Sequence, residues 1–356
     1  MSPVAPPATA EAALDALFVP FADGTLTLPA ARPVLFLGAR AGVWTSAHRE
    51  VDWHCVQGFK PFADALGRRG LGVSELAESD RYAQVLVLPP RQRDQARALF
   101  AAALHHAAAD AVVVAAVANL EGARSAEADF ERLAGPVRVL SKHKCRVFWS
   151  LPGERRVDAG LAADWRALDR PRRIGDGDIV SRPGLFAWDR IDPASRLLAE
   201  TLPASLAGRV ADLGAGYGYL SMQVLARCPA VRAIDLYEAD ARALAPARLN
   251  LERAARDRVD PVTWSVHWHD VTAGLPQRYD AIVSNPPFHQ GRAGQPELGQ
   301  AFIAAAADAL TPRGRLWLVA NRHLPYELEL ARRFGAVDTP AERDGFKVIT
   351  AGEVRR

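Results

Sequence analysis

The chain has 356 residues, of which 49% are hydrophobic and 24% are charged, as in a globular protein with a substantial core. This length exceeds that of most single domains, so we expect two. No stretch supplies the roughly 18 uninterrupted apolar residues of a membrane span, and the amino terminus lacks the basic region of a secretion signal. We therefore expect a cytoplasmic protein that is neither disordered nor membrane-spanning.

The basic residues and cysteines narrow the function classes further. The net charge is only +3, but 40 of the 44 basic residues are arginines, a side chain suited to phosphate binding and base stacking. They cluster in the first half, at "GRRG", "PPRQRDQAR", "SKHKCR" and "RALDRPRRIG". The three cysteines are far apart and the nine histidines show no metal-ligand spacing, so we expect free thiols and no metal site.

Strand-like and helix-like segments alternate along the whole chain, which predicts an α/β fold with a mostly parallel sheet. In the first half the strand candidates are "RPVLFLG", "AQVLVLPP", "VVAAVAN" and "CRVFWS". A segment rich in charge, proline and glycine follows at residues 152–184. We expect the domain boundary there, with domains at residues 1–180 and 181–356.

The second half continues the alternation. Its strand candidates are "RVADL", "AIDLY", "VTWSVHW", "YDAIVS", "RLWLVA" and "GFKVITA", and helix candidates such as "LSMQVLARC" and "QAFIAAAADAL" lie between them. The first-half strands match four of these segments in the same order, which indicates a duplicated domain. The first copy lacks the polar groups of the second. In our alignment Leu37 stands opposite Asp212, and Val87 and Leu88 stand opposite Ser284 and Asn285.

A glycine loop opens the second copy. "RVADLGAGYGYL" carries Asp212 at the end of a strand and then Gly214, Gly216 and Gly218 before a helix-like run. Glycines let a ligand approach the backbone closely, and a helix amino terminus favours negative charge, so the loop is typical of a nucleotide site. A tight strand-to-helix turn is the alternative.

Two acids downstream have the positions of nucleoside ligands. Glu238 ends the next strand, at about the spacing of a ribose-binding carboxylate. Asp235 and Asp240 compete for that role, although Asp240 has a helix-capping explanation. Asp270 in "HWHDV" ends another strand and could accept a hydrogen bond from an adenine amino group, or it is an ordinary loop aspartate.

The stretch "YDAIVSNPPFHQG" stops a strand abruptly. Pro286 and Pro287 cannot continue a sheet ladder, so the strand should end at Ser284 or Asn285. Such a corner presents Asn285 and Phe288 at a strand's carboxyl end, where open parallel sheets bind ligands. A plain loop is the alternative.

Glycine loop, Glu238, Asp270 and "NPPF" in this order resemble a class I S-adenosylmethionine-dependent methyltransferase. "SNPPFHQG", "LWLVANRHLPY", "GFKVITA" and "PGLFAWDRIDPASRLL" resemble the ribosomal RNA guanine-N2 methyltransferases of the RsmC and RlmG type. The resemblance implies two tandem Rossmann-like domains, of which the first is degenerate and the second is catalytic. Ala194 departs from the glycine that is common in that family.

The resemblance also assigns roles. It implies that Asp212 and the three loop glycines hold the methionine part of S-adenosylmethionine, Glu238 its ribose and Asp270 its adenine. Asn285, Pro286, Pro287 and Phe288 would hold the target guanine: the Asn285 oxygen and the Pro286 carbonyl are acceptors for the two amine hydrogens, and Phe288 would stack on the base. His289, Arg292 and Arg322 are further candidates for substrate contacts.

These expectations give a ribosomal RNA guanine-N2 methyltransferase, most simply one acting on the small subunit as a monomer. The partner would be ribosomal RNA or a ribosomal subunit. Three other functions stay open at this point: a protein glutamine-N5 methyltransferase, a nucleic-acid adenine-N6 methyltransferase, and a noncatalytic RNA-binding assembly factor. For the first domain we expect either phosphate contacts with RNA, from Arg91, Arg93, Lys142, Lys144 and Arg146, or a purely stabilising role.

Overall fold

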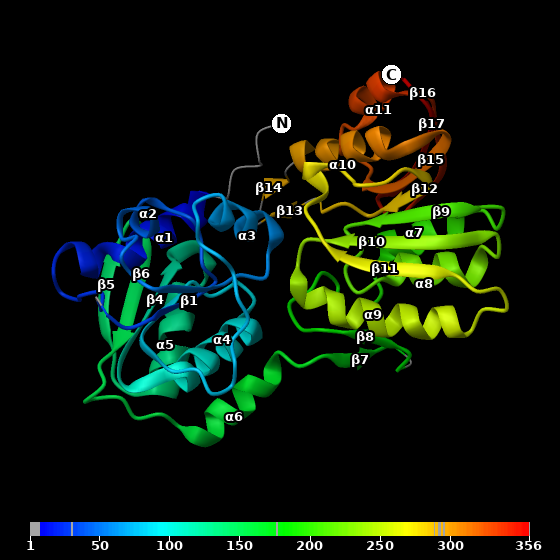
Figure 1. The fold of residues 1–356 in the computed structure, drawn as a ribbon. Helices are drawn as coiled ribbons and strands as arrows, with labels where there is room; N and C mark the ends of the chain where they lie inside the picture. Colours follow the sequence, from blue (N-terminus) through cyan, green and yellow to red (C-terminus); the bar gives the residue numbers. More distant parts are fainter. Residues whose placement is uncertain are drawn as a thin grey trace. The chain divides into compact units, whose positions relative to one another are not determined.

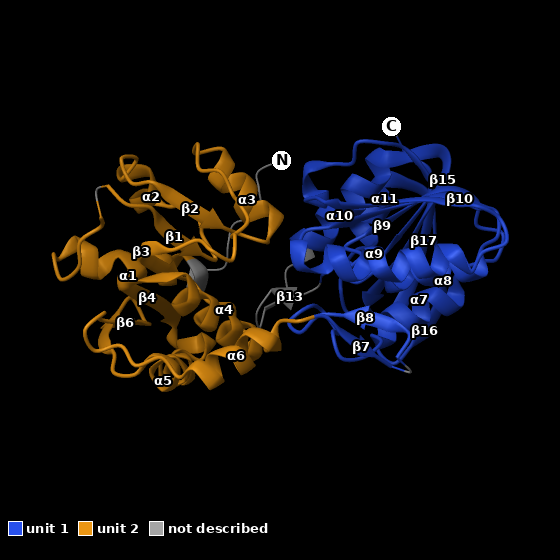
Figure 2. Cartoon of the chain, turned by 60° about the horizontal axis from the view of Figure 1, so that its bottom comes forward, with its two compact units in different colours: residues 1–4, 171–356 blue, residues 5–170 orange. Residues whose placement is uncertain are grey.

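The computed structural model describes residues 8–29, 31–175, 177–287, 289–290, 293–294 and 296–355. Its contacts divide the chain into two compact units, residues 5–170 and 171–356 (Figure 2). The division falls earlier than the position near Ser181 that the sequence suggested. No helix in the described ranges is long and apolar enough to cross a membrane.

The first unit is built on a six-stranded sheet in the order β2-β1-β3-β4-β6-β5, of which β1, β4, β5 and β6 are labelled in Figure 1. The strands β2, β1, β3 and β4 are parallel, and β6 and β5 close the edge as an antiparallel hairpin. The strands are β1 (Val34–Leu37), β2 (Trp53–Val56), β3 (Tyr82–Val87), β4 (Ala107–Ala118), β5 (Arg138–Lys142) and β6 (Cys145–Ser150).

Helices cover both faces of this sheet, because successive strand residues point to opposite sides. Val34 and Phe36 pack with α1 and α3, whereas Leu35 and Leu37 pack with α4, α5 and α6. The helices of this unit are α1 (Ala8–Ala22), α2 (Val43–Ala47), α3 (Lys60–Gly67), α4 (Arg93–His106), α5 (Ala123–Ala134) and α6 (Ala159–Leu168), with a 3₁₀ turn η1 (Asn119–Glu121).

The second unit contains a seven-stranded sheet in the order β11-β10-β9-β12-β15-β17-β16, and β17 and β16 are antiparallel to their neighbours. Every strand predicted in this half is present. The strands are β9 (Gly208–Leu213), β10 (Val231–Glu238), β11 (Thr263–Trp268), β12 (Tyr279–Ser284), β15 (Leu310–Asn321), β16 (Phe334–Arg343) and β17 (Phe346–Val354); two short hairpins add β7 (Arg172–Ile174) with β8 (Ile179–Ser181), and β13 (His289–Gln290) with β14 (Ala293–Gly294).

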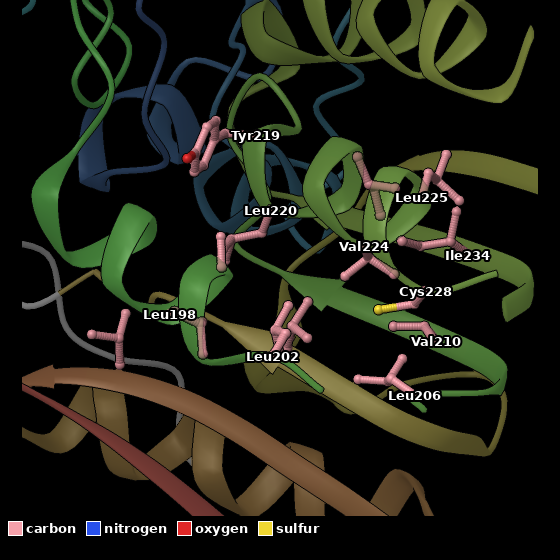
Figure 3. Close-up of a cluster of buried hydrophobic side chains, with 14 of the residues drawn as sticks. Leu198, Leu202, Leu206, Val210, Tyr219, Leu220, Val224, Leu225, Cys228 and Ile234 are labelled. Carbon is pink, nitrogen blue, oxygen red and sulfur yellow. The ribbon is translucent and has the colours of Figure 1, made fainter. Parts of the chain in front are cut away.

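The second unit also has two apolar layers, one on each side of its sheet. One layer packs β9 and β10 against α7, α8 and α9, and Figure 3 shows Leu198, Val210 and Val224 among its buried side chains. The other layer lies under α10 and α11. The helices are α7 (Pro193–Thr201), α8 (Tyr219–Arg227), α9 (Ala241–Arg256), α10 (Pro296–Ala309) and α11 (Glu327–Arg333), with a 3₁₀ turn η2 (Val271–Ala273).

The two sheets share one topology, which supports the duplication. The order β2-β1-β3-β4-β6-β5 matches β10-β9-β12-β15-β17-β16, with the same parallel and antiparallel neighbours. The described part of the first unit has no strand corresponding to β11, and an isolated parallel bridge between Cys55 and Val73 lies at that edge. The predicted free thiols are confirmed, because Cys55, Cys145 and Cys228 are buried and unpaired.

The β7–β8 hairpin belongs to the second unit because Asn250 of α9 holds it there. The Asn250 side chain accepts a hydrogen bond from the Val180 N–H and donates to the Val180 carbonyl, both at 2.8 Å, and donates at 2.8 Å to the Tyr217 carbonyl in the glycine loop. Ile174 and Ile179 join the core layer of α7, α8 and α9. The hairpin therefore buttresses the loop that the sequence assigned to cofactor binding.

Candidate active site

The parallel strands of the second sheet bring the predicted site residues to one edge. Since β11, β10, β9, β12 and β15 are mutually parallel, their carboxyl ends meet there. The glycine loop follows β9, Glu238 ends β10, Asp270 follows β11, Asn285 follows β12 and Arg322 follows β15.

The glycine loop has the geometry that the sequence suggested. Gly214, Gly216 and Gly218 have φ values of 71°, 54° and 87°, in the left-handed region that side chains rarely adopt. A Cβ added to Gly218 would lie 3.1 Å from Leu251, so this glycine allows close packing. A Cβ added to Gly216 would meet nothing within 4 Å. Gly216 therefore borders open space, as expected where a ligand approaches the backbone.

Asp212 is fully buried, and one of its oxygens organises the loop. Its Oδ2 accepts hydrogen bonds from the N–H of Ser221, at 3.1 Å, and from the Ser221 hydroxyl, at 2.7 Å, which ties β9 to the first turns of α8. Its Oδ1 is buried without a hydrogen-bond partner among the described residues. Burial raises the pKa of Asp212 to about 7.

Glu238 lies beside the open side of the glycine loop. Its carboxylate accepts hydrogen bonds from the N–H groups of Gly216, at 2.8 Å, and of Asp240, at 2.7 Å. Burial raises the pKa of Glu238, although these two hydrogen bonds oppose the effect. The two other acids that were considered for ribose binding have other partners. Asp240 caps α9 through the Arg242 N–H, and Asp235 binds Arg209 and Tyr279.

Asp270 caps the short turn η2. Its Oδ1 accepts hydrogen bonds from the N–H and the hydroxyl of Thr272, at 2.9 and 2.7 Å. This capping fixes the carboxyl group immediately beyond β11, on the strand next to the one that ends with Glu238. The two carboxyl groups thus follow neighbouring strands, in the order expected for binding two parts of a nucleoside.

Asn285 has a fixed orientation. Its Nδ2 donates to Asp192 Oδ2 at 3.0 Å and to Ser195 Oγ at 2.8 Å. Because a carboxylate can only accept, the Asn285 nitrogen must face Asp192 and the oxygen must face away. That oxygen, Oδ1, is buried and has no hydrogen-bond partner in the described part of the chain. A buried acceptor without a hydrogen-bond partner costs about 1–3 kcal/mol of folding free energy, so its presence here indicates a role in ligand binding and not in stability.

The other predicted substrate residues surround this corner to different extents. Pro286 is buried and Pro287 is exposed at the end of β12. Arg322 is exposed on the same edge, and its N–H donates to the Gly345 carbonyl at 2.8 Å. Phe288 and Arg292 lie outside the described residues, as does the side chain of His289. No group of three or more His, Cys, Asp or Glu side chains suited to a metal occurs within the described ranges.

Sequence reasoning missed the residues that hold the site from behind. Asp192 caps α7, accepting from the Ser195 N–H at 2.8 Å, and the preceding loop is fixed by the Tyr217 hydroxyl, which donates to the Arg190 carbonyl at 3.1 Å. "DPAS" is a recognisable helix start, with an acid at the cap and proline in the first turn. That pattern explains the cap but gives no hint of Asn285.

The corresponding corner of the first unit has different chemistry. The strand register corrects the sequence alignment here: Gly38 matches Gly214, so Phe36 and not Leu37 stands opposite Asp212. By the same register Gln57 matches Glu238, and Leu88 matches Asn285 as the sequence suggested.

This first-unit corner is also closed by its own groups. Arg40 takes the place of the open Gly216, and its guanidinium lies over the Phe62 ring at 4.7 Å. Gln57 donates to the Ala39 carbonyl at 2.7 Å, and a Cβ added to Gly38 would overlap the Leu88 carbonyl oxygen. This corner therefore lacks both the carboxylates and the open glycine of the second unit.

Fold and site together define a class I S-adenosylmethionine-dependent methyltransferase, since an open glycine loop, a carboxylate at the end of the next strand and an Asn-Pro-Pro corner share one sheet edge. Comparison with known proteins agrees. A family model described as "Methyltransferase small domain" matches residues 176–350. The chain belongs to the ribosomal RNA small subunit methyltransferase C family, which confirms the resemblance stated from the sequence.

Individual relatives extend over most of the chain. Ribosomal RNA small subunit methyltransferase C of Shewanella sp. (strain MR-4) is 31% identical over 304 residues, which are 84% of this chain and 85% of that protein. Its counterpart in Pseudomonas paraeruginosa is 35% identical over 216 residues, 61% of this chain and 63% of that protein. The structure of the T. thermophilus 16S rRNA N2 methyltransferase RsmC, in complex with AdoMet and guanosine, superposes with a TM-score of 0.77 at 26% identity and covers 92% of this chain and 90% of that chain.

Proposed function

We propose that the second unit transfers a methyl group from S-adenosylmethionine to the exocyclic N2 amine of a guanine in the RNA of the small ribosomal subunit. The observation that carries this proposal is the buried Asn285 oxygen, which has no hydrogen-bond partner among the described residues, beside an edge that also presents Glu238 and the open Gly216. The T. thermophilus relative was solved with AdoMet and guanosine, the two ligands that such a reaction brings together.

The residues present fit the cofactor. Glu238 offers a carboxylate for the ribose hydroxyls, Asp270 a carboxylate for the adenine amino group, and Gly216 an open backbone next to them. Asp212 supplies a buried carboxyl group, whose Oδ1 has no hydrogen-bond partner among the described residues, below the loop that would hold the methionine part. When bound, S-adenosylmethionine supplies an electrophilic methyl group on a positively charged sulfur.

The role of Asn285 follows from the weakness of the nucleophile. The lone pair of a guanine N2 amine is delocalised into the ring, so the amine must be oriented to react. Acceptance of its two hydrogens by the Asn285 oxygen and the Pro286 carbonyl would direct the lone pair at the methyl carbon. The nitrogen lone pair would form the new N–C bond, the C–S bonding pair would leave with the sulfur, and one amine proton would then pass to water. A strong general base is not needed.

Further contacts would hold the base and the RNA. We assign stacking on the guanine to Phe288, and contacts with the base or its phosphates to Pro287, His289, Arg292 and Arg322. Stacking of a base on an aromatic ring contributes about 1–3 kcal/mol. We further propose that the protein acts as a monomer, in the cytoplasm where its ribosomal substrate is found.

Methylation of purified small subunits and of naked 16S RNA with labelled cofactor tests this function. Nucleoside analysis should find N2-methylguanosine at one position, and Asn285→Ala should give none above background. Label in N6-methyladenosine, or in glutamine of a ribosomal protein, would instead support the two rival activities. Binding of RNA without any methyl transfer would support a noncatalytic assembly factor. Light scattering, which measures the molar mass in solution, tests whether the protein is a monomer.

The first unit has an exposed basic edge, which favours an RNA-holding role. Arg91 follows β3, and the turn that carries Lys142 and Lys144 lies beside the end of β4. All three side chains are exposed, and among the described residues none of them has an ion-pair partner.

Two of the five residues suggested by the sequence are already neutralised. Arg93 donates to Asp129 at 2.7 and 2.9 Å, and Arg146 is paired with Glu127. We therefore assign the phosphate contacts to Arg91, Lys142 and Lys144, which are on the edge that corresponds to the active-site edge of the second unit. The alternative is that the first unit only stabilises the second.

A further inference from the structure

Two residues to which the sequence analysis assigned no role hold the reactive side chain of the site. Asp192 and Ser195 both accept hydrogen bonds from Asn285 Nδ2, at 3.0 and 2.8 Å, so both amide hydrogens of Asn285 are used. Within the described part of the chain, the Asn285 oxygen is the polar atom of this side chain that has no hydrogen-bond partner. Its direction is therefore set from the side opposite to the substrate.

The acceptors themselves are rigidly placed. Asp192 Oδ2 also receives the Ser195 N–H at 2.8 Å, as the cap of α7, where the positive end of the helix favours a carboxylate. Ser195 is buried in the first turn of that helix. Both acceptors of the Asn285 amide thus belong to a packed helix terminus. Rotation of the Asn285 amide by half a turn would bring its oxygen against a carboxylate.

The charge of Asp192 adds an electrostatic effect to this orientation. Hydrogen bonds to a carboxylate are roughly twice as strong as neutral ones, and linked hydrogen bonds polarise each other. Donation from Nδ2 to Asp192 therefore makes the Asn285 oxygen a better acceptor. As the methyl group transfers, the guanine N2 nitrogen becomes positively charged and its hydrogens become stronger donors. The stabilisation is largest in the transition state, where it accelerates the reaction.

We propose that Asp192, assisted by Ser195, is a positioning residue that locks and polarises Asn285 for transfer to the target amine. This inference rests on the proposed guanine-N2 methylation. It predicts that removal of the Asp192 charge slows turnover without weakening cofactor binding, because Asp192 acts through Asn285.

Asp192→Asn tests the charge at nearly constant shape, since its amide oxygen can still accept the bonds of Asn285 and of the α7 cap. We expect kcat for methylation of small subunits to fall about 10- to 100-fold, with the Kd of S-adenosylmethionine and the Tm close to those of the unaltered protein. Ser195→Ala removes only a neutral acceptor and should lower kcat a few-fold. Asp189→Asn is the matched control: it removes an exposed charge three positions away that pairs with Arg190, and should leave kcat unchanged.

A spectroscopic readout makes the lock testable without activity. The chain has four asparagines, so protein labelled with ¹⁵N in asparagine gives few side-chain amide signals, and Asn285→Ala identifies the pair from Asn285. That pair should exchange slowly with solvent and should shift in Asp192→Asn but not in Asp189→Asn. If the Asn285 signals exchange freely, or if Asp192→Asn turns over like the unaltered protein, the inference is overturned. If the unaltered protein forms no N2-methylguanosine while the signals behave as expected, the proposed function fails and the lock stands.

Discussion

Replacement of Asn285 by alanine should separate catalysis from stability, because the two effects of the change on folding oppose each other. The variant loses the hydrogen bond to Asp192, which involves a charge and contributes about 1.5–3 kcal/mol, and the bond to Ser195, which contributes about 0.5–1.5 kcal/mol. It also removes the buried Oδ1 without a partner, whose desolvation costs about 1–3 kcal/mol. Combined, these ranges give a net change in the free energy of unfolding between a gain of about 1 and a loss of about 3.5 kcal/mol, centred on a loss of about 1 kcal/mol.

Methyl transfer should respond far more strongly. Loss of the oriented acceptor should lower kcat by at least about 10²- to 10³-fold, as for other groups that stabilise charge in a transition state. Affinity for S-adenosylmethionine should stay within a few-fold, since Glu238, Gly216 and Asp270 are unchanged.

Urea unfolding, calorimetry and a methylation assay on small subunits measure these three quantities. Asn321→Ala provides a control on the same sheet edge, where the Asn321 side-chain oxygen accepts an exposed hydrogen bond from the His323 N–H, at 3.2 Å. A loss of more than about 4 kcal/mol in unfolding free energy, or turnover like that of the control, would refute the reasoning.

Three other outcomes are expected. Asp212→Asn should weaken the pH dependence of stability. The folded protein keeps a proton on Asp212 up to about pH 7, whereas an unfolded aspartate releases it near pH 4, so the unaltered protein should lose about 1.4 kcal/mol per pH unit between these two values. Thermal melts of both proteins between about pH 4 and 7 measure this loss, and equal slopes would contradict it. Calorimetry should find one S-adenosylmethionine site per chain, and a stoichiometry of two would contradict the assignment. The affinity should fall when the pH is lowered through the raised pKa of Glu238, because the carboxyl group is then protonated, and it should be lost in Glu238→Ala. Reversal of charge at Arg91, Lys142 and Lys144 should weaken RNA binding and flatten its salt dependence without affecting cofactor affinity. The same reversal at the exposed Arg49, Arg68 and Arg132 is the control and should change neither RNA binding nor its salt dependence. Equal behaviour of both triple variants would favour a purely stabilising first unit.

Sequence patterns alone located most of the second sheet and of the candidate site. Apolar runs that end in glycine, acid or proline mark strands and their carboxyl ends, and the parallel arrangement brings those ends together. Glu238, the three loop glycines and Asn285 could therefore be placed at one edge before any coordinates were known. The strand β16 was missed because it is an edge strand with mostly exposed residues and contains Pro340, so it lacks the apolar run of a central strand.

Contacts between residues far apart in the sequence became known only from the tertiary structure. The start of the second unit before β7 depends on Asn250, which binds Val180 from 70 positions away. The partner of Asn285 is 93 positions away, in a helix cap that reads as ordinary helix initiation. Sequence patterns identified the central strands and the residue types that follow them, because short-range periodicity and turn chemistry act within a few residues. Only the folded chain decided which oxygen of the Asn285 corner stays free, because that depends on which distant groups use its hydrogens.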